Sequence, residues 1–283
     1  MRQRDGAGAQ IAGRSVILVL LLTATVRILP AAELQKGTVL AWDRYLQWAQ
    51  QKVTRELSNP NVFLIQNTLL PKERSEIWQK LTRGEVFVEQ MPSVVPQGIP
   101  FEVPSGEIHH WWGAILLRNV TLEHVMHFLQ DYDHHAGKFS DVERSRLISK
   151  NGDQYRFYFR LRRSKAFVTA YYNTEQECTY TYHGANRISS QSEAVKIAEL
   201  EDADTPSEKE KQPGNDRGFL WRLASWWRFE QRGPDTVIEL ESASLSRDIP
   251  ALIKFMPGVS HYIRSTPKES LESVLTSIRE NVK

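Results

Sequence analysis

The sequence predicts an α+β protein: a curved antiparallel sheet of six to seven strands wrapped over a long C-terminal helix, with an N-terminal helical extension. Between residues 106 and 245, strand-like segments follow one another with short connections, which favours antiparallel neighbours. A periodic helical segment then ends the sequence. Because a sheet of this size cannot bury its inner face alone, we expect the terminal helix to lie across it.

The first 32 residues have the composition of an export signal. Arg2, Arg4 and Arg14 precede an almost unbroken aliphatic run at residues 16–26, the order typical of secretory signals. The run is shorter than the about 20 residues that a membrane-spanning helix needs. We expect cleavage near Ala32, with an uncleaved anchor or a buried core helix as the alternatives. A signal or an anchor predicts a protein exported to the periplasm or outside the cell, membrane-anchored in the uncleaved case.

The rest of the chain is close to electrically neutral. The sequence has 36 basic and 34 acidic side chains, and residues 1–32 hold four of the basic ones against Asp5. A near-neutral domain lacks the basic surface that binds nucleic acid, so nucleic acid is excluded as a partner. The single cysteine, Cys178, allows neither an intramolecular disulfide nor a thiolate metal cluster, and we expect a buried, inert thiol.

Residues 33–105 are predicted to be a helical extension followed by a proline-rich linker. A helix is expected at residues 38–57, because apolar residues recur at spacings of three and four: Val39, Trp42, Leu46, Ala49 and Val53. A second helix is expected at residues 71–83 and a strand at 85–90. The prolines at 92, 96, 100 and 104 exclude regular structure, so residues 91–106 are predicted to be extended.

Residues 106–283 are predicted to form the main domain. A short helix is expected at residues 122–130 and a polar loop at 201–216. Strands are expected at residues 107–117, 142–149, 154–163, 166–172, 177–183, 187–200, 219–230 and 236–245. The segment 154–163 alternates strictly, as a half-buried strand does. One face consists of Tyr155, Phe157, Phe159 and Leu161, and the other of Arg156, Tyr158, Arg160 and Arg162.

The segment from residue 249 to the end is predicted to be helical with one break, at Pro257-Gly258. A clean helix is expected to begin at Pro267, because proline is favoured in the first helical turn. Its apolar face consists of Leu271, Val274, Leu275 and Ile278. This is the helix expected to cover the sheet.

Three passages carry a resemblance to a known superfamily. The first is WGAILLRNVT at 112–121 followed by FLQDY at 128–132, and the second is RSRL at 144–147 leading to the strand at 157–161. The third is GFLWRL at 218–223 with WWRFE at 226–230, ELES at 239–242 and LSRDIP at 245–250. In this order they resemble the START-like, or SRPBCC, superfamily of helix-grip proteins, in particular exported bacterial members of unassigned function. The resemblance implies a cavity, which by itself is not an activity.

Candidate ligand-binding residues are the aromatic side chains on the strands and near the helix break. They are Trp112, Tyr155, Phe157, Phe159, Trp221, Trp226 and Phe255. If the cavity lies on the basic face instead, Tyr158 and Arg160 would hold an anionic head group; otherwise that face is a solvated ladder of charges. Glu239 and Glu241 share a strand face, and are either an acid/base pair or partners of Arg222 and Arg228 at a cavity mouth.

The sequence assigns no catalytic residue, metal site or cofactor. Six histidines occur at positions 109, 110, 124, 127, 134 and 135, without a recognised metal-binding spacing. We expect them to be solvated or hydrogen-bonded, with a metal site as the alternative.

Three functional hypotheses remain open. The first is an exported binding protein that holds a hydrophobic ligand, of the lipid, isoprenoid or quinone type, in an apolar cavity and can contact membranes transiently. The second is a cyclase- or hydrolase-like enzyme for an aromatic or acyl substrate, with Glu239, Glu241 or a histidine as acid/base. The third is a protein with a filled cavity that acts through its surface.

Overall fold

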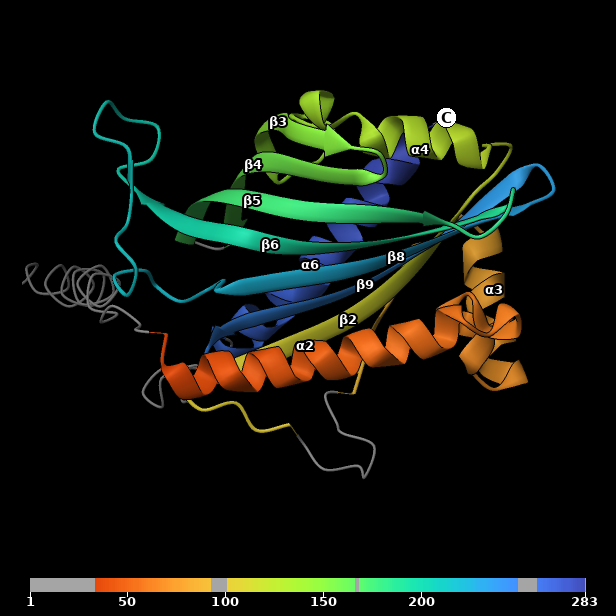
Figure 1. The fold of residues 1–283 in the computed structure, drawn as a ribbon, viewed down its shortest axis with the longest axis horizontal. Helices are drawn as coiled ribbons and strands as arrows, with labels where there is room; N and C mark the ends of the chain where they lie inside the picture. Colours follow the sequence, from red (N-terminus) through yellow and green to blue (C-terminus); the bar gives the residue numbers. More distant parts are fainter. Residues whose placement is uncertain (1–33, 93–100, 166–167, 249–258, 283) are drawn as a thin grey trace, which may run out of the picture.

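The computed structural model describes residues 34–92, 101–165, 168–248 and 259–282. Its centre is a curved antiparallel sheet, with the long helix α6 on its concave face and helix α2 on its convex face (Figure 1). The predicted export segment, residues 1–32, and the predicted site residue Phe255 lie outside the described residues.

The sheet has nine strands, more than the six to seven expected. Their order is β1-β2-β9-β8-β6-β5-β4-β3, with β7 paired to β6 beside this path. The bounds are β1 Phe87–Gln90, β2 Gly106–Leu117, β3 Val142–Asn151, β4 Gln154–Lys165, β5 Val168–Tyr182, β6 Arg187–Glu201, β7 Lys209–Glu210, β8 Arg222–Arg232 and β9 Asp235–Arg247.

Three local differences relate the eight strand segments expected between residues 107 and 245 to the nine strands observed. Strand β1, from the N-terminal extension, pairs with β2 and so joins the main sheet. The short strand β7 forms within the segment expected to be a loop. The two strands expected at 166–172 and 177–183 are instead one long strand, β5, whose pairing with β6 shifts register at Glu175/Gln176. The extra residue of this bulge, Val195, lies on β6, and β5 continues past it without interruption.

The helices lie close to the predicted positions. They are α2 Lys36–Leu57, α3 Pro71–Thr82, α4 Leu122–Gln130 and α6 Val259–Asn281, with 3-10 turns η1 Pro60–Val62, η2 Ile65–Thr68 and η3 Tyr132–His134. Helix α6 begins before the expected start, so Pro267 lies inside it rather than in its first turn. Proline removes one backbone hydrogen bond, which a helix packed along a sheet can tolerate.

Helix α6 lies close against the concave face at Gly113 of β2. A Cβ atom at this position would lie 2.7 Å from Leu275 Cδ1 and 2.7 Å from the carbonyl oxygen of Phe87. Leu275 and Ile278 are fully buried against the sheet, as the apolar face of the terminal helix predicts. Glycine at 113 therefore sets how closely the helix is held.

The convex face is covered by the N-terminal extension. Trp42, Tyr45 and Val53 of α2 pack on a cluster that includes Trp226 of β8 and Leu245 of β9. The segment from η1 to α3 covers a neighbouring cluster on β2 and β9, which includes Trp112, Ala114, Leu116 and Val237. Strands β2, β8 and β9 are thus buried on both faces.

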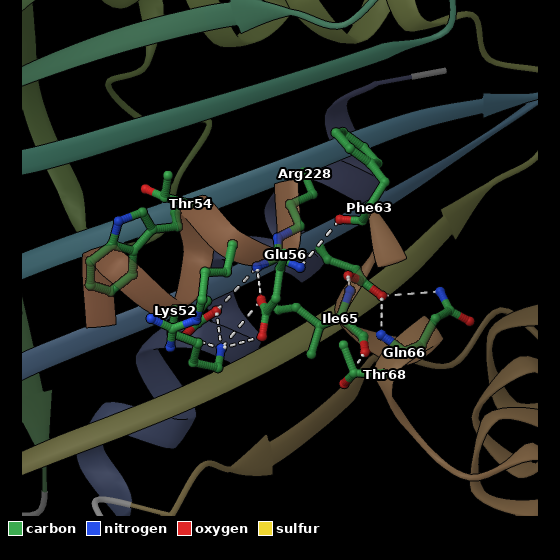
Figure 2. A network of polar contacts seen from close by, with 12 residues as sticks. Lys52, Thr54, Glu56, Phe63, Ile65, Gln66, Thr68 and Arg228 are labelled. Atoms are coloured by element: carbon green, nitrogen blue, oxygen red, sulfur yellow. Dashed lines mark hydrogen bonds and ion pairs between the residues drawn. The ribbon is translucent and has the colours of Figure 1, made fainter. Parts of the chain in front are cut away.

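Charged side chains are buried between α2 and the centre of the sheet. Arg228 of β8 and Glu241 of β9 are 0% exposed. Arg228 donates to Glu56 Oε2 and to the carbonyl oxygen of Phe63 (Figure 2). Lys52 Nζ donates to both oxygens of Glu241, at 3.0 and 3.2 Å. These partners all come from α2 and the turn after it, so the extension neutralises charges that the sheet cannot leave unpaired.

Two carboxylates of β9 have opposite pKa shifts in this cluster. Glu239 accepts from the backbone N–H groups of Ile65 and Gln66, and burial nevertheless raises its pKa to about 7. Burial also opposes ionisation of Glu241, but the hydrogen bond from His110 and the charges of His110, Lys52 and Arg228 lower its pKa to about 2. Glu241 is therefore the ionised member that balances the buried cations.

Replacing Glu241 by Gln should destabilise the fold by about 3–5 kcal/mol at neutral pH, because Lys52 and Arg228 lose their buried counter-charge. The lowered pKa of Glu241 stabilises the folded protein. This stabilisation is fully present above pH 4.5, the pKa of the carboxyl in the unfolded chain, and is lost as the pH falls toward about 2. In urea titrations, the difference between wild type and Glu241→Gln should thus be constant above about pH 6 and shrink below about pH 5. Glu177→Gln, at a carboxylate that is 56% exposed, should change stability by less than about 0.5 kcal/mol.

Replacing Gly113 by Ala should lower the free energy of unfolding by about 1–3 kcal/mol, because the added methyl meets the Phe87 carbonyl, which cannot move aside as a side chain can. Gly37→Ala is the matched control, since a Cβ there would be no closer than 3.7 Å to Pro104 Cγ. In the first turn of α2 this substitution should stabilise the protein by about 0.4–1 kcal/mol. Equal stability of wild type and Gly113→Ala in urea denaturation would contradict the close helix–sheet contact.

Candidate functional site

A cavity of about 760 Å³ lies between the concave face of the sheet and helix α6. Strands β2, β8 and β9 line one side, β4, β5 and β6 line another, and α6 contributes Leu271, Val274 and Ser277. The volume is within the range of about 300–1,000 Å³ that is typical of small-molecule sites.

Small side chains on the strands leave this space open. Serines occupy concave-face positions on three neighbouring strands, at Ser190 and Ser192 of β6, Ser225 of β8, and Ser242 and Ser244 of β9. Farther along β2 and β9, positions of the same parity hold Ile115 and Ile238, which are 0% exposed. The core is filled where the side chains are large, and open where they are serines.

Aromatic side chains line the end of the cavity near α4. Tyr132 of η3 stacks on Phe157 of β4, with ring centroids 4.0 Å apart and an interplanar angle of 13°. His135 packs against Phe139 and Phe159. Its Nε2 lies 3.0 Å from the carbonyl oxygen of Phe128, which can only accept, and burial lowers the pKa of His135. The imidazole is thus neutral and forms part of the apolar wall.

Few charged groups line the cavity. Among the described lining residues they are Asp141, Arg163 and Arg247. Arg163 Nη1 donates to Asp141 Oδ2 at 2.7 Å, so these two charges neutralise each other. Cys178 also lines the cavity, and burial raises the pKa of its thiol to about 11, which makes it a poor nucleophile.

Of the predicted site residues, Phe157 and Phe159 line the cavity. Tyr155 has the same orientation but lies beyond the cavity, packed against Tyr132 and Tyr180 in the core. The cavity therefore lies on the apolar face of β4, one of the two possibilities that the sequence left open.

The tryptophan predictions chose the wrong member of each adjacent pair. Trp112 and Trp226 point to the convex face, where Trp226 Nε1 donates to Gln50 Oε1 at 2.8 Å. Their neighbours Trp111 and Trp227 line the cavity instead. Successive strand side chains alternate between faces, so one tryptophan of each pair had to face inward, but the pair alone does not say which. Trp221 belongs to the cluster beneath α2.

The predicted polar site residues also lie away from the cavity. Tyr158 donates to Asn173 Oδ1 at 2.6 Å on the outer face. Arg160, on the same face, is 2% exposed and ion-paired with Glu143, Asp204 and Glu208. It is therefore neither a solvated charge nor a ligand contact. Glu239 is buried on the convex face, as described above, so Glu239 and Glu241 cannot act on a molecule in the cavity.

Most of the residues that line the cavity were not predicted from the sequence, among them Leu129, Tyr132, Phe139, Tyr172, Tyr180 and Phe229. Alternation along β5 offered a signal for two of them, because Tyr172 and Tyr180 share the face of Cys178. Leu129, Tyr132 and Phe139 lie in α4 or in the segment after it, where side chains do not alternate as they do in a strand. Their position in the cavity wall depends on how this segment packs over the sheet, which the local sequence does not show.

The histidines form no metal site in the part of the chain that the structure describes, where no cluster of three or more His, Cys, Asp or Glu side chains could hold a metal ion. His109 Nε2 lies 3.0 Å from Ser246 Oγ, and His110 Nδ1 lies 2.5 Å from the hydroxyl of Tyr45.

Among the described helices, none is long and apolar enough to span a membrane.

Comparison with solved structures gives matches at low sequence identity. A STAR-related lipid transfer protein fragment from Xanthomonas axonopodis is 16% identical, over 64% of this chain and 95% of its own, with a TM-score of 0.45. A START superfamily protein from Mycobacterium smegmatis is 10% identical, over 61% of this chain and 96% of its own, with a TM-score of 0.38. The ZhuI aromatase/cyclase from Streptomyces sp. R1128 is 11% identical, over 62% of this chain and 94% of its own, with a TM-score of 0.39. No family model and no curated protein matches the sequence.

The topology of the described chain confirms the predicted fold class. A curved antiparallel sheet holds the C-terminal helix α6 across its concave face, and the short helix α4 follows the first long strand. The protein has a START-like helix-grip fold.

Proposed function

We propose that this protein binds a hydrophobic ligand, of the lipid, isoprenoid or quinone type, in the cavity beneath α6. The supporting observation is the separation of polar and apolar groups on the two faces of the sheet. Arg228, Glu239 and Glu241 are buried on the convex face, whereas the cavity is lined mainly by aromatic, aliphatic and serine side chains. Binding would gain about 25 cal/mol for each Å² of apolar surface removed from water.

The arrangement offers less support for the enzymatic alternative. The two carboxylates suggested as acid and base lie on the face opposite the cavity. Inside it, Asp141 is paired with Arg163, and the pKa of Cys178 is raised. Helix α2 packs on the convex face, away from the cavity, so it gives no support to the alternative of a filled cavity.

The proposed function includes export. In this proposal residues 1–32 are a signal or an anchor, residues 33–105 are an N-terminal helical extension and linker, and residues 106–283 form the binding domain. Its support is the order of basic and aliphatic residues at the N-terminus. An exported carrier would meet membranes, and transient contact with them is part of the same proposal.

Filling the cavity should abolish binding without unfolding the protein. Ser242→Phe adds a ring above the central strand β9, and we expect at least a tenfold loss of affinity for a fluorescent fatty acid or quinone analogue, about 1.4 kcal/mol. Thr179→Phe is the control, because Thr179 is exposed on the outer face of β5. Binding that is unchanged in Ser242→Phe, or absent from the wild type for all such probes, would contradict the proposal.

Export predicts a defined N-terminus in the producing cell. N-terminal sequencing of protein recovered from the exported fraction should give a chain that starts at Glu33 if the signal is cleaved. An uncleaved anchor should instead give an intact N-terminus in the membrane fraction. Intact protein in the cytosolic fraction alone would contradict both forms of the proposal.

A further inference from the structure

Three hydrogen-bond donors in the cavity wall have no partner. The atoms are Trp111 Nε1, Arg163 Nε and the hydroxyl of Tyr172, all buried and bonded to no group in the described part of the chain. A buried polar group without a partner is unfavourable and rare in native proteins. Three such donors on residues that line one cavity point to a ligand that carries acceptor oxygens.

Tyr172 is the most constrained of the three. Its side chain is 5% exposed, and burial raises the pKa of its hydroxyl, so the group keeps its proton and remains a donor. On the neighbouring strand β4, Leu161 is paired with Tyr172 and Arg163 is paired with Ala170. Arg163 is thus a diagonal neighbour of Tyr172 on the same face, within reach for two long side chains.

The charge around Arg163 favours a neutral ligand group. Arg163 is already neutralised by Asp141 at 2.7 Å, and Glu269 lies 3.7 Å from its Nη2. A ligand carboxylate or phosphate placed here would meet two acidic side chains. A hydroxyl, ketone or ester oxygen would accept from Tyr172 and Arg163 without that repulsion.

We propose that the ligand is a neutral amphiphile whose oxygen atom accepts a hydrogen bond from the Tyr172 hydroxyl, while its apolar part occupies the aromatic end of the cavity. This inference rests on the proposed binding function. A pure hydrocarbon would fill the same space but would leave the donors unpaired, so Tyr172 selects oxygenated ligands against hydrocarbons.

Tyr180 provides a matched comparison on the same strand. It lines the same cavity, but its hydroxyl is already hydrogen-bonded to the hydroxyl of Tyr132, at 3.0 Å. Tyr180→Phe therefore removes an existing internal bond, whereas Tyr172→Phe removes a donor that no described group uses. Each variant deletes one tyrosine hydroxyl. Comparing them separates an effect on the stability of the fold from an effect on ligand binding.

The experiment is displacement of a bound fluorescent probe from the full chain by dodecane, 2-dodecanone and dodecanoate. The ketone has the same chain length as the alkane and can only accept a hydrogen bond. We expect wild type to bind 2-dodecanone about tenfold more tightly than dodecane. Tyr172→Phe should reduce this ratio to near one without lowering stability, and Tyr180→Phe should keep the ratio but unfold at lower urea concentration.

The outcomes separate this inference from the proposed function. If dodecane and 2-dodecanone bind wild type equally well, the cavity binds hydrophobic molecules but the role of Tyr172 is wrong. The same conclusion follows if Tyr172→Phe retains the wild-type ratio. Dodecanoate that binds more tightly than the ketone would overturn the neutral head group. If none of the three displaces the probe, both the proposed function and the inference are overturned.

Discussion

The structure depends on the pairing of charges that are buried on the convex face of the sheet. Arg228 and Glu241 lie on the central strands β8 and β9 with no access to solvent. Burying such groups is unfavourable unless partners with good geometry surround them, and Lys52, Glu56 and the Phe63 carbonyl provide these partners. The N-terminal extension is therefore a structural part of the sheet, whose edge strand β1 it also supplies.

This arrangement leaves the concave face free for a cavity. Because strand side chains alternate, the same two strands carry charges outward and Ser225, Ser242 and Ser244 inward. Helix α6 is held close to β2 at Gly113, while the serines on neighbouring strands leave the space beneath it open. One sheet thus supports a polar interior on one side and a mainly apolar cavity on the other.

The chemistry of the cavity narrows what it can hold. Its aromatic end contains a neutral imidazole, which has no net charge, and a tyrosine hydroxyl that is already paired internally. The donors of Trp111, Arg163 and Tyr172 have no partner in the described part of the chain, and in our proposal they favour a ligand with acceptor oxygens. Shape and apolar burial would supply affinity, and these few polar atoms would supply orientation and selectivity.

The sequence by itself determined the fold class, most strands, the terminal helix with its apolar face, and the shared face of Phe157 and Phe159, but not which face of that strand lines the cavity. These follow from local periodicity, which depends only on near neighbours in the chain. The structure alone decided which tryptophan of each pair faces the cavity, because a period of two defines alternation but not direction. It alone also showed why Arg228 and Glu241 can be buried: Lys52 lies 189 residues from Glu241 in the chain, and no local pattern records such a contact.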